Sequence, residues 1–383
     1  MVALFGSVLS RAELRRRLGT PAAAAGVRLL RFEDGPERGV RHIEFRTGTG
    51  LRFTVLVDRC MDLGDLEWLG MPFGWQSATG YRSPALTDLE AEGGLGLLRS
   101  FSGFLVTCGF DHVRRPETET GAQASSLPRK ETFHPLHGRG ALTPARLVGY
   151  GADWSGDDLT LWCEGEVRQA FVFGEHLVLR RRIEARAGTS RLTIADTIVN
   201  EGCEPAVHML LYHINLGWPL LDEGAAFAAP VEETVWSNHA LEDQAYGCRT
   251  QPPPLARAAQ QVFVHRVRSD PSGSVSAALL NPRLAAGVRV SWPKTQLPWL
   301  QQWQCASEGV YALGIEPVTN RFGSRAELAQ SGELITLAPG ERRRYDLAID
   351  VLHGRAAIDA HAAAAAQIER RHEKPVRTGT TVP

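Results

Sequence analysis

Three short stretches of the sequence place residues that can move protons beside apolar strands. "LLYHINLGWP" holds His213 and Asn215, two residues apart, and "FHPLHGRG" holds His137 and Arg139. "YALGIEPVTN" ends an apolar run at Glu316. At neutral pH a carboxylate can act as a base and an imidazolium as an acid, and each contributes roughly 10²–10⁴-fold in rate. These residue types therefore indicate acid–base catalysis.

The period of a β-strand decides which of these side chains share a face. Residues two apart point to the same side, so His213 and Asn215 project together. Glu316 alternates with Leu313 and Ile315, so it faces away from the bulky apolar side chains. Two simpler interpretations of these residues, without catalysis, are also open. Glu316 would then be a solvated carboxylate at a strand end, and His213 a core histidine satisfied by Asn215.

The same residue types could also hold a divalent metal, because sets of His and Glu bind zinc in several enzymes. These histidines lack the i, i+4 spacing of a helical ligand pair. No GxSxG elbow, P-loop or dinucleotide fingerprint lies in a strand–turn–helix context. We therefore expect no metal and no cofactor, and keep a metal-assisted isomerase or lyase as the alternative.

Composition narrows the class of partner. The 383 residues include 42 basic and 43 acidic ones, a formal net charge of −1 that gives no case for nucleic acid or an anionic membrane. The six cysteines are far apart and form no CxxC, so free thiols are expected. The first apolar run has no basic region before it, and no run reaches the ~18 apolar residues of a membrane helix. A cytoplasmic protein is the expectation.

Strand signals dominate the chain. Residues 40–59 read as two alternating strands around a glycine-containing turn. Residues 158–202 read as several strands with turns at 165–166, 174–176 and 187–190. Many short strands broken by Gly, Pro and Asn are typical of an antiparallel sandwich or barrel, so the fold class is all-β.

Three segments divide the chain. Residues 1–20 are a helical extension, because "SRAELRRRLG" has a serine cap and a closing glycine. Residues 21–355 form the β-sandwich domain, with "RRPETETGAQASSLPRK" and "QPPPLARAAQ" as surface loops. Residues 356–383 are an Ala-rich helix and a flexible tail, expected to lie outside the core.

Six segments, in order over about residues 40–352, are similar to one known family. They are "VDRCMDLGDLEWLGMPFGWQSATG", "FSGFLVTCGFDHV", "HPLHGRGALTPA", "MLLYHINLGWPLLDEGA", "GIEPVTNRFGSRAE" and "LAPGERRRYDL". The sequence resembles the aldose 1-epimerase (galactose mutarotase) superfamily, in particular its branch of uncharacterised bacterial aldose 1-epimerase family proteins. The resemblance implies an antiparallel β-supersandwich with a few short helices and a concave face that binds a monosaccharide.

The resemblance also implies residue roles. Glu316 would take the proton from the anomeric hydroxyl, and His213 would protonate the ring oxygen. The ring opens, the C1 carbonyl rotates, and closure gives the other anomer. His137 would bind the sugar and help polarise the ring oxygen, and Asn215 would support His213.

The sequence also departs from the family. The Asn- and Arg-rich segment and the aspartate that grip the sugar in true galactose mutarotases have no clear match. Arg59, Arg139, Gln302 and Trp303 are the candidates for those contacts. "HGR" stands where the family has "HGG", so Arg139 either binds an anionic sugar through bidentate bonds or forms an internal salt bridge.

The sequence thus predicts a cofactor-independent carbohydrate isomerase that interconverts anomers or epimers of a free or anionic monosaccharide, as a monomer or homodimer. The non-enzyme alternative is a sugar-binding or regulatory module that has kept the cleft and lost catalysis.

Overall fold

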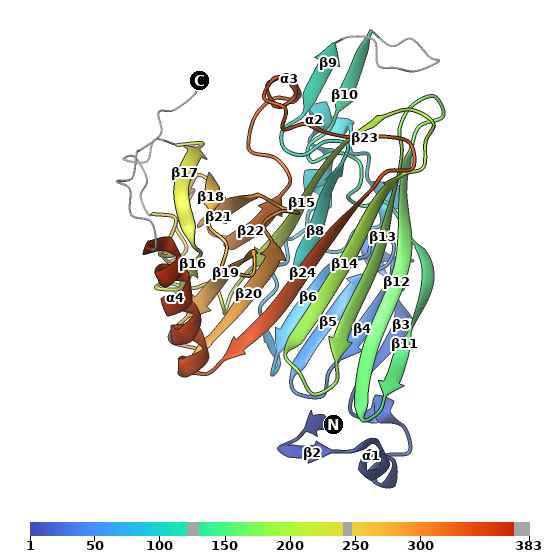
Figure 1. Cartoon of the computed structure of the whole chain (residues 1–383), viewed down its shortest axis with the longest axis vertical. Helices are drawn as coiled ribbons and strands as arrows, with labels where there is room; N and C mark the ends of the chain where they lie inside the picture. Colours follow the sequence, from blue (N-terminus) through green and yellow to red (C-terminus); the bar gives the residue numbers. More distant parts are fainter. Residues whose placement is uncertain (121–129, 240–246, 371–383) are drawn as a thin grey trace.

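The computed structural model describes residues 1–120, 130–239 and 247–370, and its regular secondary structure is mainly antiparallel sheet (Figure 1). The largest sheet has eight strands in the order β11-β12-β13-β14-β24-β20-β19-β16. Their bounds are β11 Arg146–Ser155, β12 Asp158–Ala170, β13 His176–Arg186, β14 Arg191–Asn200, β24 Arg342–His353, β20 Ala286–Pro293, β19 Ser274–Asn281 and β16 Ala226–Ala228.

A seven-stranded sheet lies beside it in the order β17-β18-β21-β22-β15-β23, with β8 also paired to β15. The bounds are β17 Val231–Ser237, β18 Gln261–Val267, β21 Trp299–Cys305, β22 Ala312–Val318, β15 Ala206–Leu216, β23 Ile335–Leu337 and β8 Leu105–Phe110. A five-stranded sheet contains β3 Gly26–Arg31, β4 Arg41–Arg46, β5 Leu51–Leu56, β6 Asp62–Trp68 and β7 Met71–Pro72. Two hairpins complete the strands: β1 Val2–Leu4 with β2 Ser7–Leu9, and β9 Glu117–Thr120 with β10 Glu131–His134.

Strand β15 separates two apolar clusters. Its residues Tyr212 and Ile214 lie in the main core between the sheets. Leu211, on the opposite face, packs in a second cluster with Trp75 and Phe101. The strand is buried on both sides, so its sequence is an almost unbroken apolar run. The all-β prediction is confirmed.

A buried ionic group joins the three large sheets. Arg181 of β13 pairs with Asp196 of β14 at 2.6 Å and with Asp62 of β6 at 3.2 Å. The hydroxyl of Tyr212 on β15 donates to Asp196 at 2.7 Å. Since Arg181 is 0 % exposed, its charge depends on these carboxylates.

The described residues contain four α-helices beside the sheets: α1 Arg11–Arg17, α2 Ala91–Gly94, α3 Arg325–Gln330 and α4 Arg355–Arg370. Helix α1 begins at the predicted cap, where Ser10 and Glu13 form a capping box. Helix α4 corrects the expectation that the C-terminal helix lies outside the core, because Ile358 packs against Ala278 and Leu280 in a small buried cluster. Residues 371–383 lie outside the described residues.

The strand predictions hold with two corrections. β4 and β5 occupy residues 40–59 as expected, but β12 runs straight through the turn predicted at 165–166. Gly165 is there because a Cβ would lie 2.3 Å from the sulfur of Met61. The predicted loop "RRPETETGAQASSLPRK" contains β9, while residues 121–129 lie outside the described residues.

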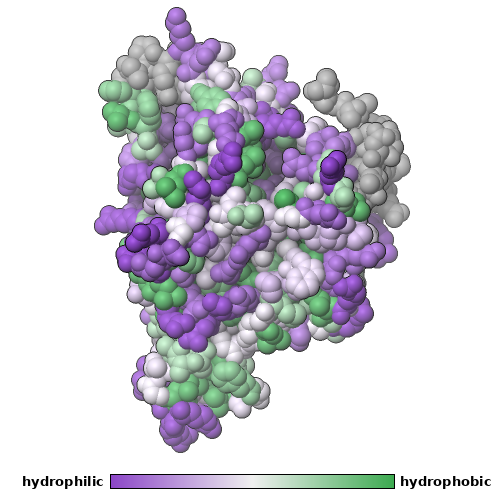
Figure 2. All heavy atoms as spheres, turned by 180° about the vertical axis from the view of Figure 1, so that it is seen from behind, coloured by the Kyte–Doolittle hydropathy of each residue, from purple (hydrophilic) through white to green (hydrophobic). Residues whose placement is uncertain are grey.

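Three further features of the structure are an exposed apolar region, the state of the cysteines and the apolarity of the helices. At the lower end of the molecule, apolar side chains gather over the β1–β2 hairpin, where Phe5 and Val8 are exposed (Figure 2). All six cysteines are free thiols, as predicted. Among the helices of the described residues, none has the length and apolarity to cross a membrane.

Candidate active site

Two neighbouring strands bring Glu316 and His213 together. The register of β15 and β22 pairs Ile214 with Ile315, which sets His213 opposite Glu316. His213 Nε2 lies 3.2 Å from Glu316 Oε1. His213 is 5 % exposed and Glu316 is 3 % exposed. Glu316 is therefore buried, and it is not the solvated carboxylate at a strand end that one interpretation expected.

Burial shifts the two pKa values in opposite directions. It raises the pKa of Glu316 to about 8, against a backbone hydrogen bond from Trp303 that favours the carboxylate. Burial, and then the positive charge of a protonated His137, lower the pKa of His213 to about 3. Between these two values the pair holds one proton, as a neutral carboxyl beside a neutral imidazole.

His137 lies next to the pair in an unusual backbone conformation. Its φ is 59°, in the left-handed region that few residues other than glycine adopt, and such strain is concentrated at functional sites. Its Nδ1 accepts a hydrogen bond from the backbone N–H of Arg114 at 3.2 Å, so Nε2 carries the proton. Burial lowers the pKa of His137 to about 4, and its ring centroid lies 5.9 Å from that of His213. His137 is therefore a neutral hydrogen-bond donor.

Aromatic rings enclose the imidazole of His213. Phe101 and Trp303 contact it edge to face, with centroids at 4.9 and 5.5 Å. Trp75 packs on Trp303 at 5.7 Å. Trp303 is half-buried, so part of its indole reaches the surface. These rings bury the His213 imidazole, and burial disfavours its protonated form.

Gly314 makes room for the pair. A Cβ at this position would lie 2.6 Å from Glu316 Oε1 and 3.1 Å from His213 Cε1. A glycine inside a strand often marks such a close approach. Gln301 is directly across from Glu316 in the β21–β22 register, so its side chain shares the same face.

The described parts of the chain hold no group of three or more His, Cys, Asp or Glu side chains that could hold a metal ion.

One family covers most of the chain. The family described as "Domain of unknown function (DUF4432)" matches residues 37–351. The chain belongs to the DUF4432 family. No curated protein matches the sequence.

Solved structures share the fold of this DUF4432 chain. A "putative aldose 1-epimerase" from Klebsiella pneumoniae is 24 % identical, with a TM-score of 0.83 over 93 % of this chain and 91 % of that one. A galactose mutarotase-like protein from Clostridium acetobutylicum is 12 % identical, with a TM-score of 0.59 over 86 % and 99 %. A galactose 1-epimerase from Lactobacillus acidophilus is 12 % identical, with a TM-score of 0.54 over 86 % and 99 %. The fold is the galactose mutarotase-like β-sandwich that the sequence predicted.

In the DUF4432 chain, Asn215 and Trp303 lie near the Glu316–His213 pair. The Asn215 amide raises the pKa of His213 against burial, although its Oδ1 and His213 Nδ1 lie outside normal hydrogen-bond geometry. Asn215 Nδ2 donates to the carbonyl of Gly103 at 3.0 Å, which fixes the amide. Its predicted support of His213 stays a prediction.

Three residues that were candidates for sugar contacts have other partners in the structure: Arg59, Gln302 and Arg139. Arg59 is buried and donates to Ser100 Oγ at 2.7 Å, so it anchors the segment before Phe101. Gln302 points to the opposite face of β21, where it contacts His265 at 3.1 Å.

Arg139 forms an internal salt bridge, one of the two outcomes expected for the "HGR" stretch. Its guanidinium lies 2.6 Å from Glu90 and donates to the carbonyl of Phe133 at 2.7 Å. These partners line a polar pocket that Glu316 and His213 do not line.

Sequence reasoning missed Phe101, Gln301 and Gly314. The glycine two residues before Glu316 was a usable signal, because glycine in a strand interior indicates a close approach. Phe101 belongs to a loop, and only the tertiary fold sets it against His213.

Proposed function

We propose that this protein is a carbohydrate isomerase that interconverts the anomers of a monosaccharide by acid–base ring opening. The observation that carries the proposal is the buried Glu316–His213 pair, with His213 Nε2 3.2 Å from Glu316 Oε1. The names of similar folds, an aldose 1-epimerase and a galactose 1-epimerase, support the same class of reaction.

The reaction needs one base and one acid. Glu316, as carboxylate, takes the proton of the anomeric hydroxyl while His213, as imidazolium, protonates the ring oxygen and the C1–O5 bond breaks. The resulting aldehyde rotates about C1–C2, and the reverse proton transfers close the ring as the other anomer. The required state has the same number of protons as the resting pair. One transfer across the 3.2 Å contact, from Glu316 to His213, would produce it, against the order of the two pKa values in the resting pair.

The surrounding residues have supporting roles in this proposal. His137 donates its Nε2–H to a sugar oxygen, because Nδ1 is already occupied by Arg114. Trp303 offers an indole face for the apolar side of the ring. Arg139 is committed to Glu90, so the proposed substrate is a neutral sugar rather than an anionic one.

The test is Glu316→Gln, which keeps the shape and removes the base. We expect anomer exchange, followed by polarimetry and by exchange NMR on a panel of aldoses, to fall by at least about 10²-fold. Glu308→Gln, at an exposed glutamate, is the matched control and should keep full activity. Near-normal turnover in Glu316→Gln would exclude the mechanism, and sugar binding without exchange in the unmutated protein would indicate a binding module.

A further inference from the structure

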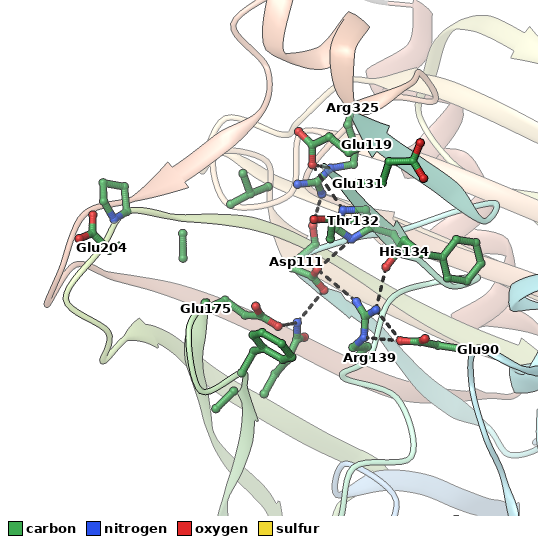
Figure 3. Close-up of a pocket in the computed structure, with 18 residues that line it drawn as sticks. Glu90, Asp111, Glu119, Glu131, Thr132, His134, Arg139, Glu175, Glu204 and Arg325 are labelled. Atoms are coloured by element: carbon green, nitrogen blue, oxygen red, sulfur yellow. Dashed lines mark hydrogen bonds and ion pairs between the residues drawn. The ribbon is translucent and has the colours of Figure 1, made fainter. Parts of the chain in front are cut away.

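A second polar pocket, of about 480 Å³, lies under the β9–β10 hairpin and beside the end of β12 (Figure 3). Ligand pockets typically measure about 300–1,000 Å³. Phe133 and Phe171 contribute aromatic surface to the lining. Glu316 and His213 do not line it, so the proposed isomerase reaction makes no use of this space.

The pocket has an excess of negative charge. Each lining cation is paired with a carboxylate: His134 with Asp111 at 3.1 Å, Arg139 with Glu90 at 2.6 Å and Arg325 with Glu119 at 3.0 Å. Burial opposes protonation of His134, but its bonds to Asp111 and Glu119 outweigh that effect and raise the pKa. The lining also includes the carboxylates of Glu131, Glu175 and Glu204. The pocket therefore favours a positively charged ligand.

Three buried polar atoms in the lining have no hydrogen-bond partner among the described residues: Thr132 Oγ1, Gln169 Oε1 and His134 Nε2, the last of which has only an ionic contact with Glu119 at 3.4 Å. Thr132 is 8 % exposed and its Oγ1 forms no hydrogen bond. Gln169 is 5 % exposed; its Nε2 donates to Asp111 at 2.7 Å and to Glu175 at 3.2 Å, but its Oε1 is unpartnered. Buried polar groups are nearly always satisfied, so unpartnered ones beside a cavity can receive hydrogen bonds from a ligand.

We infer that this pocket binds a small hydroxylated organic cation, of the class of a protonated amino sugar. The ammonium group would lie against the carboxylates of Glu131, Glu175 and Glu204, and Gln169 Oε1 and Thr132 Oγ1 would accept hydrogen bonds from the ammonium or from hydroxyl groups. Phe133 and Phe171 would pack on the apolar face of the ring. The site goes beyond the proposed isomerase function and uses different residues.

The test compares D-glucosamine with D-glucose, which differ at one ammonium group, by ligand-observed NMR titration in a weakly acidic buffer. Glucosamine should bind more tightly, and added salt should weaken it. Thr132→Val, of equal shape, should weaken glucosamine binding by about fivefold through loss of one hydrogen bond. Glu175→Gln should weaken it by about tenfold through loss of a charged one.

Matched controls separate this site from general effects. Thr118→Val changes an exposed threonine of the same hairpin, and Glu308→Gln an exposed glutamate elsewhere; both should leave binding unchanged. Equal affinity for the two sugars, or no effect of Thr132→Val and Glu175→Gln, would overturn the inference. So would stoichiometric displacement of glucosamine by magnesium chloride, which would indicate a simple cation site.

Glu316→Gln distinguishes the two proposals. Glucosamine binding should persist in this variant, whatever happens to anomer exchange. Binding that is lost in Glu316→Gln and retained in Thr132→Val would put the ligand in the candidate active site and contradict the second site.

Discussion

At the scale of single residues, the site works through burial. The same apolar surroundings stabilise the neutral forms of Glu316 and His213, so one pKa rises to about 8 and the other falls to about 3. Pairs of titratable neighbours often have pKa values that are pushed apart in this way. At neutral pH the proton lies on Glu316 and His213 is neutral, so the proposed reaction, with Glu316 as base and His213 as acid, must begin with a proton transfer from Glu316 to His213.

This single proton predicts the pH dependence of activity. The active pair holds one proton, so kcat/KM for anomer exchange should be flat across neutral pH and fall above pH about 8, where Glu316 ionises and the pair loses its acid. The fall should approach tenfold per pH unit. Rates that rise through pH 8 would show that Glu316 acts as a lone base without the shared proton.

Stability should change with pH for the same reason. The folded protein binds the Glu316 proton more tightly than the unfolded chain, because the folded-state pKa is raised from 4.5 to about 8. This stabilisation is complete below pH 4.5 and is lost as the pH rises to about 8. Relative to Glu316→Gln, the free energy of unfolding should fall in that window by up to about 1.4 kcal/mol per pH unit. Denaturant unfolding of the unmutated protein and of Glu316→Gln at several pH values measures this difference. If the free energies of unfolding of the two proteins changed in parallel with pH, the burial of Glu316 would be contradicted.

At the scale of elements, two adjacent strands do most of the positioning. β15 and β22 each present apolar side chains to the main core, and on the opposite face His213 and Glu316 lie among apolar residues such as Leu211. This second face is then covered by loops that carry Phe101, Trp75 and His137, so strands carry the proposed acid–base pair and loops supply its surroundings.

A substitution at Gly314 would test how β22 positions the carboxyl group of Glu316. Gly314→Ala would put a Cβ 2.6 Å from Glu316 Oε1 and force the carboxyl to move. Since misplacement by about 1 Å can cost about 10²-fold in rate, we expect a loss of that order with little change in KM. Gly19→Ala, where a Cβ meets open space, is the control. Full activity of Gly314→Ala in the anomer-exchange assay would show that the spacing is not critical.

At the scale of the whole molecule, the three large sheets meet at the buried Arg181 group. Asp62, Asp196 and Tyr212 come from three different sheets, and Tyr212 is the neighbour of His213 in the chain. The ionic group therefore holds the sheets in register behind the candidate active site.

Removing this arginine should destabilise the whole fold. Arg181→Met leaves two buried carboxylates without their partner, which should lower the free energy of unfolding by about 3–5 kcal/mol in denaturant melts. Arg180→Met, one residue away on the exposed face of β13, should change it by less than about 1 kcal/mol. A similar small change in both variants would refute the role of the buried group.

The sequence by itself determined the all-β class, the strands of residues 40–59, the α1 cap and the face of Glu316, because strand period and capping chemistry are local. The division into residues 1–20, 21–355 and 356–383 stays a prediction. The convergence of Glu316 and His213 from strands about a hundred residues apart came from the family resemblance rather than from spacing.

Only the tertiary structure decided the environment of those residues. The 3.2 Å contact, the opposite pKa shifts and the partners of Arg59, Arg139 and Gln302 depend on which segments fold over each strand face. A local pattern records which way a side chain points, whereas burial and pairing depend on residues far away in the chain. For this reason the sequence predicted where the acid–base groups lie, and the packed sheets and loops determined how strongly they hold a proton.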